Sequence, residues 1–204
     1  MKLSVEKISK NFAEKKILRD ISFELSPGMS AAIVGPNGSG KTTLVRIICG
    51  LIRPSSGEVK YIEDNKQILA EDSYFKIGFV GPYLELYEEL TALENIMFFA
   101  KMKRVPNAIE KFSTLMNRLN LNGREDDQVK TYSSGMRQRL KYVFALIGDP
   151  EILILDEPTS NLDTDGIDRV YDIMNDQKKN NILLLATNDQ MDLKYGDFKV
   201  EVTA

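Results

Sequence analysis

The alternation of apolar and polar positions along the chain predicts an α/β protein. Two early segments, residues 2–8 and 17–25, have strand-like patterns and predict an N-terminal antiparallel β piece. Several later segments are short and mainly apolar, as is typical of strands buried on both faces of a mostly parallel sheet. These are residues 29–34, 77–80, 152–155 and 182–186, the last of which is expected to complete the core.

Helical periodicity fills the segments between these strands. Thr91 followed three residues later by Glu94 fits a capping box, which predicts a helix that ends before Val105 and Pro106. A second helix is predicted from about 107 to 119. Apolar faces at i, i+3, i+4 and i+7 predict two more helices, from about 135 to 147 and across 167–174. A short strand is predicted at 58–62, and residues 63–71 read as loop or irregular strand.

Composition narrows the function classes. The net charge of −3, with no basic run, argues against a nucleic-acid partner. The chain has no histidine, which removes His-based catalysis and most transition-metal sites. Its single cysteine, Cys49, is expected to be a buried small hydrophobe in a reducing compartment. No apolar run approaches the roughly 20 residues of a membrane span, and the charged N-terminus does not fit a signal peptide.

One stretch carries a specific chemical pattern between a predicted strand and a predicted helix. It reads Gly35-Pro36-Asn37-Gly38-Ser39-Gly40-Lys41-Thr42-Thr43, the spacing of a phosphate-binding loop. Its glycines let backbone N–H groups point at phosphate oxygens, Lys41 reaches the β- and γ-phosphates, and Thr42 offers its hydroxyl to Mg²⁺. We therefore expect nucleotide phosphate binding here.

Two further blocks follow at positions that suit this chemistry. The buried strand at 152–155 ends in Asp156-Glu157, and Pro158 to Asp163 come next. Carboxylates at the carboxyl end of such a strand can organise Mg²⁺ and activate water, although alone they are more often a solvated turn. Ser133, Ser134 and Gly135 stand at the start of the third helix, where a simple N-cap is the alternative.

Together, in this order and spacing, the three blocks resemble the ATP-binding subunit of ABC transporters, from about Leu3 to Asn188. The resemblance implies a P-loop NTPase fold of ABC type in one domain, 1–204, with a helical subdomain inserted at about 83–148. It also implies ATP and Mg²⁺ as cofactors.

The resemblance assigns a role to each site residue. Residues 35–43 would cradle the phosphates, Asp156 and Thr42 would hold Mg²⁺, and Glu157 would polarise the attacking water. Phe12 would stack on adenine, with a core phenylalanine as the alternative reading. Ser133, Ser134, Gly135 and Asp163 would face the ATP of a second subunit in a head-to-tail homodimer or heterodimer.

The sequence departs from the family at two positions that matter for hydrolysis. Where the family has a loop glutamine after the strand at 77–80, this chain has Pro82 or Tyr83. Where the family has a Thr-His pair with histidine on the γ-phosphate, the chain has Thr187-Asn188, which makes Asn188 the candidate catalytic residue there. Ser134 and Met136 are milder changes in the signature. ATP binding is thus expected, while the rate of hydrolysis is open.

The resemblance favours an ATPase that drives transport through separate membrane-spanning subunits, placed in the cytoplasm on the inner face of the membrane. The rival is an ATP-binding dimerisation switch with little hydrolysis, beside a competent partner. A soluble ABC protein of translation or DNA repair is disfavoured because the chain has neither tandem domains nor long coiled-coil insertions. About 16 residues follow Asn188 in this sequence, so we expect no added regulatory domain. Residues 90–95 and 132–140 resemble subunits paired with ABC-2-type or haem-exporter-like permeases.

Overall fold

The structure, a computed structural model, describes residues 1–203. Its strands are β1 (Lys2–Phe12), β2 (Lys15–Leu25), β3 (Ser30–Val34), β4 (Ser56–Glu63), β5 (Lys66–Ile68), β6 (Ile77–Val80), β7 (Ile152–Asp156), β8 (Ile182–Ala186) and β9 (Phe198–Glu201). Its α-helices are α1 (Lys41–Ile48), α2 (Ala70–Ser73), α3 (Ala92–Met102), α4 (Ala108–Arg118), α5 (Ser134–Leu146) and α6 (Thr164–Asn180). Short 3₁₀ turns are η1 (Tyr74–Lys76), η2 (Val129–Thr131) and η3 (Asp192–Tyr195).

The strands form two sheets, as the sequence pattern predicts. An antiparallel sheet has the order β2-β1-β4-β5, and a wholly parallel sheet has the order β6-β7-β8-β3-β9. In the parallel sheet β8 lies between β7 and β3, pairing Ile154 with Leu184 and Ala32 with Leu185. The carboxyl ends of β3, β8 and β7 therefore open at one edge, which is where α/β sheets bind ligands.

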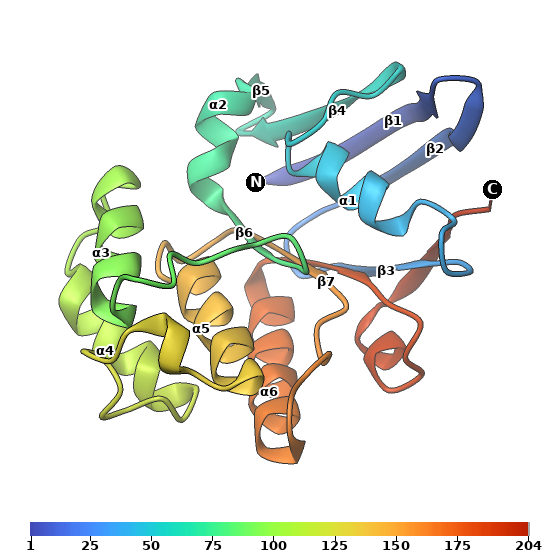
Figure 1. Cartoon of the computed structure of the whole chain (residues 1–204). Helices are drawn as coiled ribbons and strands as arrows, with labels where there is room; N and C mark the ends of the chain where they lie inside the picture. The colour runs from blue at the N-terminus through green and yellow to red at the C-terminus, as the bar shows by residue number, and fades with distance from the viewer. Residues whose placement is uncertain (204) are drawn as a thin grey trace.

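The molecule is layered, with α1 between the two sheets and α5 and α6 on the far side of the parallel sheet (Figure 1). This arrangement follows because successive side chains along a strand point to opposite faces of the sheet. Ile152 and Ile154 pack with α1 and the antiparallel sheet, whereas Leu153 and Leu155 pack with α5 and α6. Because β7 is covered on both faces, its whole run is apolar.

In the sequence, helices α3, α4 and α5 lie between β6 and β7. In space they lie to one side of the parallel sheet (Figure 1). The predicted capping box is present at the start of α3. The Glu94 amide donates to Thr91 Oγ1 at 3.1 Å, and the Thr91 amide donates to Glu94 Oε2 at 2.8 Å. The fold expected from the sequence, a parallel core with an antiparallel β piece and a helical insertion, is confirmed.

One prediction of local structure is wrong and another is incomplete. The strand β8 does not complete the core, because β9 adds a further edge strand, pairing Ile33 with Val200. For residues 63–71 the strand alternative is confirmed at β5, which the turn at Asp64 and Asn65 folds back onto β4, while the start of α2 was not predicted. The strands β5 and β9 are short, and each forms because a neighbouring strand is there to pair with it, not because of its own sequence pattern.

Candidate functional site

The loop between β3 and α1 has the geometry of an anion cradle. Gly38 and Gly40 have φ values of +80° and +109°, in the region that only glycine adopts without strain. A Cβ on Gly40 would lie 2.7 Å from Ile17 Cγ2, so the loop packs closely on β2. A Cβ on Gly38 would meet nothing within 4 Å, which leaves its other side open.

The N-terminus of α1 faces this loop with free backbone donors. Its N-cap, Gly40, provides no side-chain hydrogen bond, and the first amide to donate back into the helix is that of Leu44, to the Gly40 carbonyl at 2.9 Å. The amides of Lys41, Thr42 and Thr43 precede it and have no intrahelical acceptor. Together with the helix dipole, these donors favour a bound phosphate group.

A cavity of about 370 Å³ opens in front of the loop. It brings together most of the residues that the sequence proposed for the nucleotide, and Glu157 from the end of β7. Its lining residues are Phe12, Ile17, Asn37, Gly38, Gly40, Lys41, Thr42, Thr43 and Glu157. Gly35 and Pro36 contribute through their carbonyl groups, and Ser39 is buried beneath the loop with its Oγ unpartnered among residues 1–203.

Lys41 and Asn188 meet at the back of the cradle. Lys41 is buried, and its Nζ donates to the carbonyl oxygens of Gly35 at 2.9 Å and Pro36 at 3.4 Å. Asn188 comes from the end of β8, and its amide lies 2.7 Å from Asn37 Oδ1. With its nitrogen turned toward the loop, Asn188 donates to the Gly35 carbonyl at 2.7 Å and accepts from Lys41 Nζ at 3.0 Å. The position singled out after β8 therefore contacts the phosphate loop directly.

Asp156 is a buried carboxylate that lacks a partner. It is 1% exposed, and neither side-chain oxygen accepts a hydrogen bond from any described residue. Burial raises the pKa of Asp156, while the nearby Thr42 hydroxyl and the charge of Lys41 oppose this. A buried acid with free oxygens beside a hydroxyl is a donor set that suits a hard divalent cation, so these residues fit Mg²⁺.

Glu157 lines the cavity from a strained backbone position. Its φ is +53°, unusual for a residue with a side chain, and its amide donates to the Ala186 carbonyl of β8 at 2.8 Å. Burial raises the pKa of Glu157, with Asp156, Asp192 and Asp189 adding to this and Lys41 opposing it. A half-buried carboxylate with a raised pKa in a phosphate-binding cavity is suited to act as a base.

Phe12 lies at the cavity mouth, which rules out the core alternative. It ends β1 and is 51% exposed, and the Lys10 ammonium lies 4.9 Å from its ring centroid. An exposed aromatic ring held from one side by a cation offers its other face for stacking. Sequence reasoning missed Ile17, which lines the cavity from β2, and Lys10. The only signal for Lys10 was its place two residues before Phe12, on the same face of a strand.

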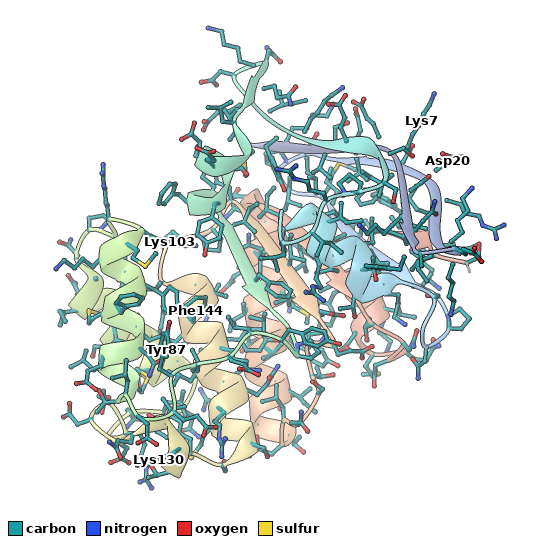
Figure 2. All side chains as sticks on the ribbon, turned by 45° about the horizontal axis from the view of Figure 1, so that its top comes forward. Lys7, Asp20, Tyr87, Lys103, Lys130 and Phe144 are labelled. Atoms are coloured by element: carbon teal, nitrogen blue, oxygen red, sulfur yellow. The ribbon has the colours of Figure 1, made fainter. Side chains whose placement is uncertain are left out.

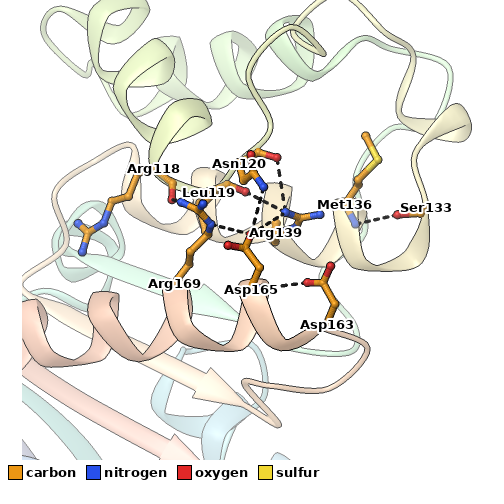
Figure 3. Close-up of polar contacts among 10 residues, drawn as sticks. Arg118, Leu119, Asn120, Ser133, Met136, Arg139, Asp163, Asp165 and Arg169 are labelled. Carbon is orange, nitrogen blue, oxygen red and sulfur yellow. Dashed lines mark hydrogen bonds and ion pairs between the residues drawn. The ribbon is translucent and has the colours of Figure 1, made fainter.

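The residues proposed to face a second subunit lie outside this cavity, at the adjacent ends of α5 and α6 (Figure 3). Ser133 is the exposed N-cap of α5, and its Oγ accepts from the Met136 amide at 3.2 Å. Asp163 is the exposed N-cap of α6 and accepts from the Gly166 amide at 2.9 Å. Ser134 is exposed, and a Cβ on Gly135 would lie 3.3 Å from the Asn161 carbonyl oxygen. These residues share one surface.

A polar cluster joins α5 and α6 behind that surface (Figure 3). Asp165 accepts from Arg169 Nε at 2.8 Å and from Asn120 Nδ2 at 3.1 Å, and Arg139 Nη1 lies 3.8 Å from it. Arg169 also donates to the Arg118 carbonyl at 2.8 Å. These contacts connect the end of α4 and the body of α5 to the first turns of α6, and so fix the two N-caps relative to each other.

The loop after β6 holds no glutamine near the cavity. Tyr83 is exposed, and its ring centroid lies 5.2 Å from the guanidinium carbon of Arg46 on α1. Neither Pro82 nor Tyr83 lines the nucleotide cavity.

Cys49, at the end of α1, packs with the core, and burial raises the pKa of its thiol. It is therefore no reactive thiolate.

Within residues 1–203, no helix is long and apolar enough to cross a membrane. In the same part of the chain, no three His, Cys, Asp or Glu side chains gather in a way that could hold a metal ion by themselves. Any Mg²⁺ at Asp156 would thus need oxygen ligands from its substrate, as is usual for Mg²⁺ bound with phosphates.

The family profile of ABC transporters matches residues 18–160. The chain is 40% identical over 166 residues to the uncharacterized ABC transporter ATP-binding protein YdbJ of Bacillus subtilis, covering 81% of this chain and 53% of that protein. It is 32% identical over 195 residues to the linearmycin resistance ATP-binding protein LnrL of the same organism, covering 93% and 62%. The chain thus spans about half to three-fifths of the length of these relatives.

Other relatives match over more of their length. The lipoprotein-releasing system ATP-binding protein LolD of Hydrogenovibrio crunogenus is 33% identical over 211 residues, covering 95% of this chain and 92% of that protein. A solved ATP-binding subunit of an ABC transporter superposes with a TM-score of 0.87 at 26% identity, covering 100% and 89%. A dimeric ATP-binding cassette in a post-hydrolysis state, bound to ADP and Pi, shares the fold with a TM-score of 0.83 at 24% identity, covering 98% and 94%.

Proposed function

This chain belongs to the ABC transporter ATP-binding family, and from that premise we propose that it hydrolyses ATP to drive transport through separate membrane-spanning subunits. The observation that carries the proposal is the meeting of Lys41 and Glu157 in one cavity, with the carboxylate of the preceding residue, Asp156, buried and unpartnered among residues 1–203.

ATP binding follows from the cavity lining. The adenine ring would stack on the open face of Phe12, since Lys10 already lies over the other face. The triphosphate would accept hydrogen bonds from the free amides of the first turn of α1. It would also accept from Lys41, whose ammonium lies at the loop carbonyls of Gly35 and Pro36. Thr42 and Asp156 would hold Mg²⁺, which when bound neutralises charge on the β- and γ-phosphates.

Hydrolysis requires a group that takes a proton from the attacking water. Glu157 is placed for this because it lines the phosphate end of the cavity and its raised pKa makes it a better base than a free carboxylate. Asn188, which contacts the phosphate loop, would donate from its amide to the γ-phosphate.

The active species would be a head-to-tail dimer, either of two copies or with a related subunit. Ser133, Ser134 and Asp163 are exposed on one surface at the N-termini of α5 and α6 and contact no part of the chain's own cavity. The N-terminus of α5, capped by the Ser133 hydroxyl, suits the γ-phosphate of a nucleotide held by a second subunit. Asp163, which caps α6 on the same surface, would face that subunit as well.

The membrane-spanning partner would dock on an exposed aromatic surface beside α3, and this contact would hold the chain on the inner face of the membrane. The surface comprises Tyr74, Phe75, Tyr87, Phe98 and Met102, all exposed. Tyr87 and Phe98 meet edge to face with ring centroids 6.3 Å apart, and Lys103 at the end of α3 lies 5.3 Å from the Tyr74 ring. Tyr87 and Lys103 lie on the same side of the molecule (Figure 2). Such a gathering of exposed apolar side chains is typical of an interaction site.

A second candidate is an ATP-dependent dimerisation switch that hydrolyses little. It is favoured by the amide side chain of Asn188 at the phosphate loop, which cannot carry a positive charge near neutral pH, and by the absence of a glutamine at Pro82 and Tyr83. The presence of Glu157 in the cavity favours the ATPase.

The binding and dimer steps are tested with Glu157→Gln, with Lys41→Ala as the matched control. The first variant keeps the phosphate cradle, so it should bind Mg-ATP in a calorimetric titration and elute as a dimer in size-exclusion chromatography with Mg-ATP. Lys41→Ala should stay a monomer at the same nucleotide concentration. A Glu157→Gln protein that binds ATP but remains a monomer would contradict a homodimer, and one that binds no ATP would contradict the site.

A further inference from the structure

Asp192 is a buried carboxylate outside the nucleotide cavity. It begins η3, a few residues after β8, and is 1% exposed. No lysine or arginine within residues 1–203 forms an ion pair with it. Its partners are three hydroxyl groups instead, from Thr187 at 2.9 Å, Tyr171 at 3.1 Å, and Thr159 at 3.2 Å. A buried charge held only by neutral donors is costly to the fold and calls for an explanation.

Two of these hydroxyls belong to segments that carry the chemistry. Thr187 immediately precedes Asn188, and its Oγ1 also accepts from the Asp189 amide at 3.0 Å. Thr159 lies two residues after Glu157, in the turn that leaves β7. The third hydroxyl, of Tyr171, comes from the middle of α6. The Asp192 carboxylate therefore joins the segment that carries Asn188 to the turn that carries Glu157.

We propose that Asp192 is a positioning residue for ATP hydrolysis, which holds the Asn188 segment and the Glu157 turn in one fixed relation. The inference rests on the proposed ATPase function. Asp192 touches no nucleotide and acts only through Thr187 and Thr159.

The Glu157 turn needs such support. Its backbone is in the left-handed region at φ +53°, a conformation that persists in a residue with a side chain only when its surroundings determine it. Three hydrogen bonds help to hold this turn. The Glu157 amide donates to the Ala186 carbonyl, the Tyr142 hydroxyl donates to the Pro158 carbonyl at 2.7 Å, and the Thr159 hydroxyl donates to the Asp192 carboxylate. The first of these reaches the end of β8 through a single backbone bond, and the last reaches the Asn188 segment through the side chains of Asp192 and Thr187.

Position matters here because a base must align with water and phosphate. A shift of about 1 Å in a reacting group can cost on the order of 100-fold in rate. Loss of Asp192 would free the Thr187 and Thr159 hydroxyls together, and so loosen both groups that act on the γ-phosphate. The nucleotide cradle, built from β3 and α1, would keep its own contacts.

A purely structural role makes a different prediction. Burial raises the pKa of Asp192, with Asp189 adding to this, while the hydroxyls of Thr187, Tyr171 and Thr159 offset it in part. The ionised carboxylate is thus less favoured in the fold than in water. If Asp192 served stability alone, Asp192→Asn would leave turnover unchanged.

The experiment uses the full chain with Asp192→Ala and Asp192→Asn, and Tyr171→Phe as the matched control that removes a hydroxyl from the same carboxylate. Phosphate release from Mg-ATP should show kcat about tenfold lower in Asp192→Ala, with KM within twofold of wild type. The kcat of Asp192→Asn should lie between those of Asp192→Ala and wild type, because the amide oxygen still accepts a hydrogen bond. Tyr171→Phe should match wild type. Equal kcat in wild type and Asp192→Ala, or an equal loss in Tyr171→Phe, would overturn the proposal.

A second readout separates this inference from the ATPase proposal. Native-state hydrogen exchange should become faster in both 157–162 and 187–191 in Asp192→Ala, and in neither segment in Tyr171→Phe. If wild type shows no turnover, the ATPase proposal fails and exchange alone decides the positioning role. Unchanged exchange, or a change in one segment only, overturns it. Should Asp192→Ala not fold, Thr159→Val and Thr187→Val each break one link and should each lower kcat.

Discussion

Replacing Asn188 with histidine should raise the rate of ATP hydrolysis. Asn188 is exposed at the carboxyl end of β8, and its amide reaches the Gly35 carbonyl at 2.7 Å and Lys41 Nζ at 3.0 Å, so an imidazole at this position would also lie at the phosphate loop. The amide is a neutral donor, whereas a protonated imidazole would place a full charge on the developing oxyanion.

The size of the effect follows from what the amide already supplies. Loss of an oxyanion donor costs on the order of 10²–10³ in rate. Because Asn188 retains a donor, we expect a smaller deficit, about tenfold, which corresponds to about 1.4 kcal/mol of barrier. The gain should appear in kcat with little change in KM, the pattern of an interaction made mainly in the transition state.

The assay is steady-state phosphate release at saturating Mg-ATP by wild type, Asn188→His and Gln190→His. The last variant is a matched control, since it places an imidazole on the same exposed turn. The chain has no other histidine, so the proton resonances of the new imidazole would report its pKa directly. A kcat in Asn188→His equal to or below that of wild type would refute the idea that this position limits hydrolysis.

Further predictions concern binding, docking and stability. Lys41→Ala should weaken Mg-ATP binding by about 1.5–3 kcal/mol in calorimetry, because a charge-assisted contact is lost; unchanged affinity would contradict the phosphate cradle. Phe12→Ala should lose about 1 kcal/mol of affinity for both ATP and GTP through the stacking surface, and a loss for neither would remove Phe12 from the site. Phe98→Glu should abolish co-purification with the membrane subunit while leaving Mg-ATP affinity unchanged, and retained co-purification would exclude the aromatic surface as the docking site. Burial raises the pKa of Asp197, but hydrogen bonds from Lys178 and from the start of β3 outweigh this and hold it below its ordinary value. A lowered pKa stabilises the fold above about pH 4 and less as pH falls, so Asp197→Asn should lower the Tm slightly at pH 7 and converge on wild type in acid; a gap that persists in acid would contradict this.

The parts of the fold that the sequence predicted are those specified by local pattern. The capping box of α3 is such a case, because Thr91 and Glu94 satisfy each other's backbone donors without help from the rest of the chain. The apolar run of β7 is another, since burial on both faces leaves no polar alternative. The phosphate loop is local too, as its glycines and Lys41 lie within a single turn.

The parts that escaped prediction depend on contacts between distant segments. The four residues of β9 read Phe-Lys-Val-Glu, with only Val200 buried, and they form a strand because the edge of β3 is there to pair with them. Asp192 reads as one more polar residue in a turn, and becomes buried only because α6 and the segments after β7 and β8 converge on it. Whether Phe12 was a core residue could not be decided from its own neighbours, since both alternatives fit the end of a strand.

The proposal that this chain is an ATPase rather than a binding switch is tested most directly by the rate of phosphate release from saturating Mg-ATP by the purified protein, beside Glu157→Gln. A positioned base contributes about 10²–10⁴ to such a rate. We therefore expect wild type to turn over at least about 100-fold faster than the variant, with both proteins binding ATP. Equal rates in the two proteins would contradict the account and leave ATP binding as the chain's function.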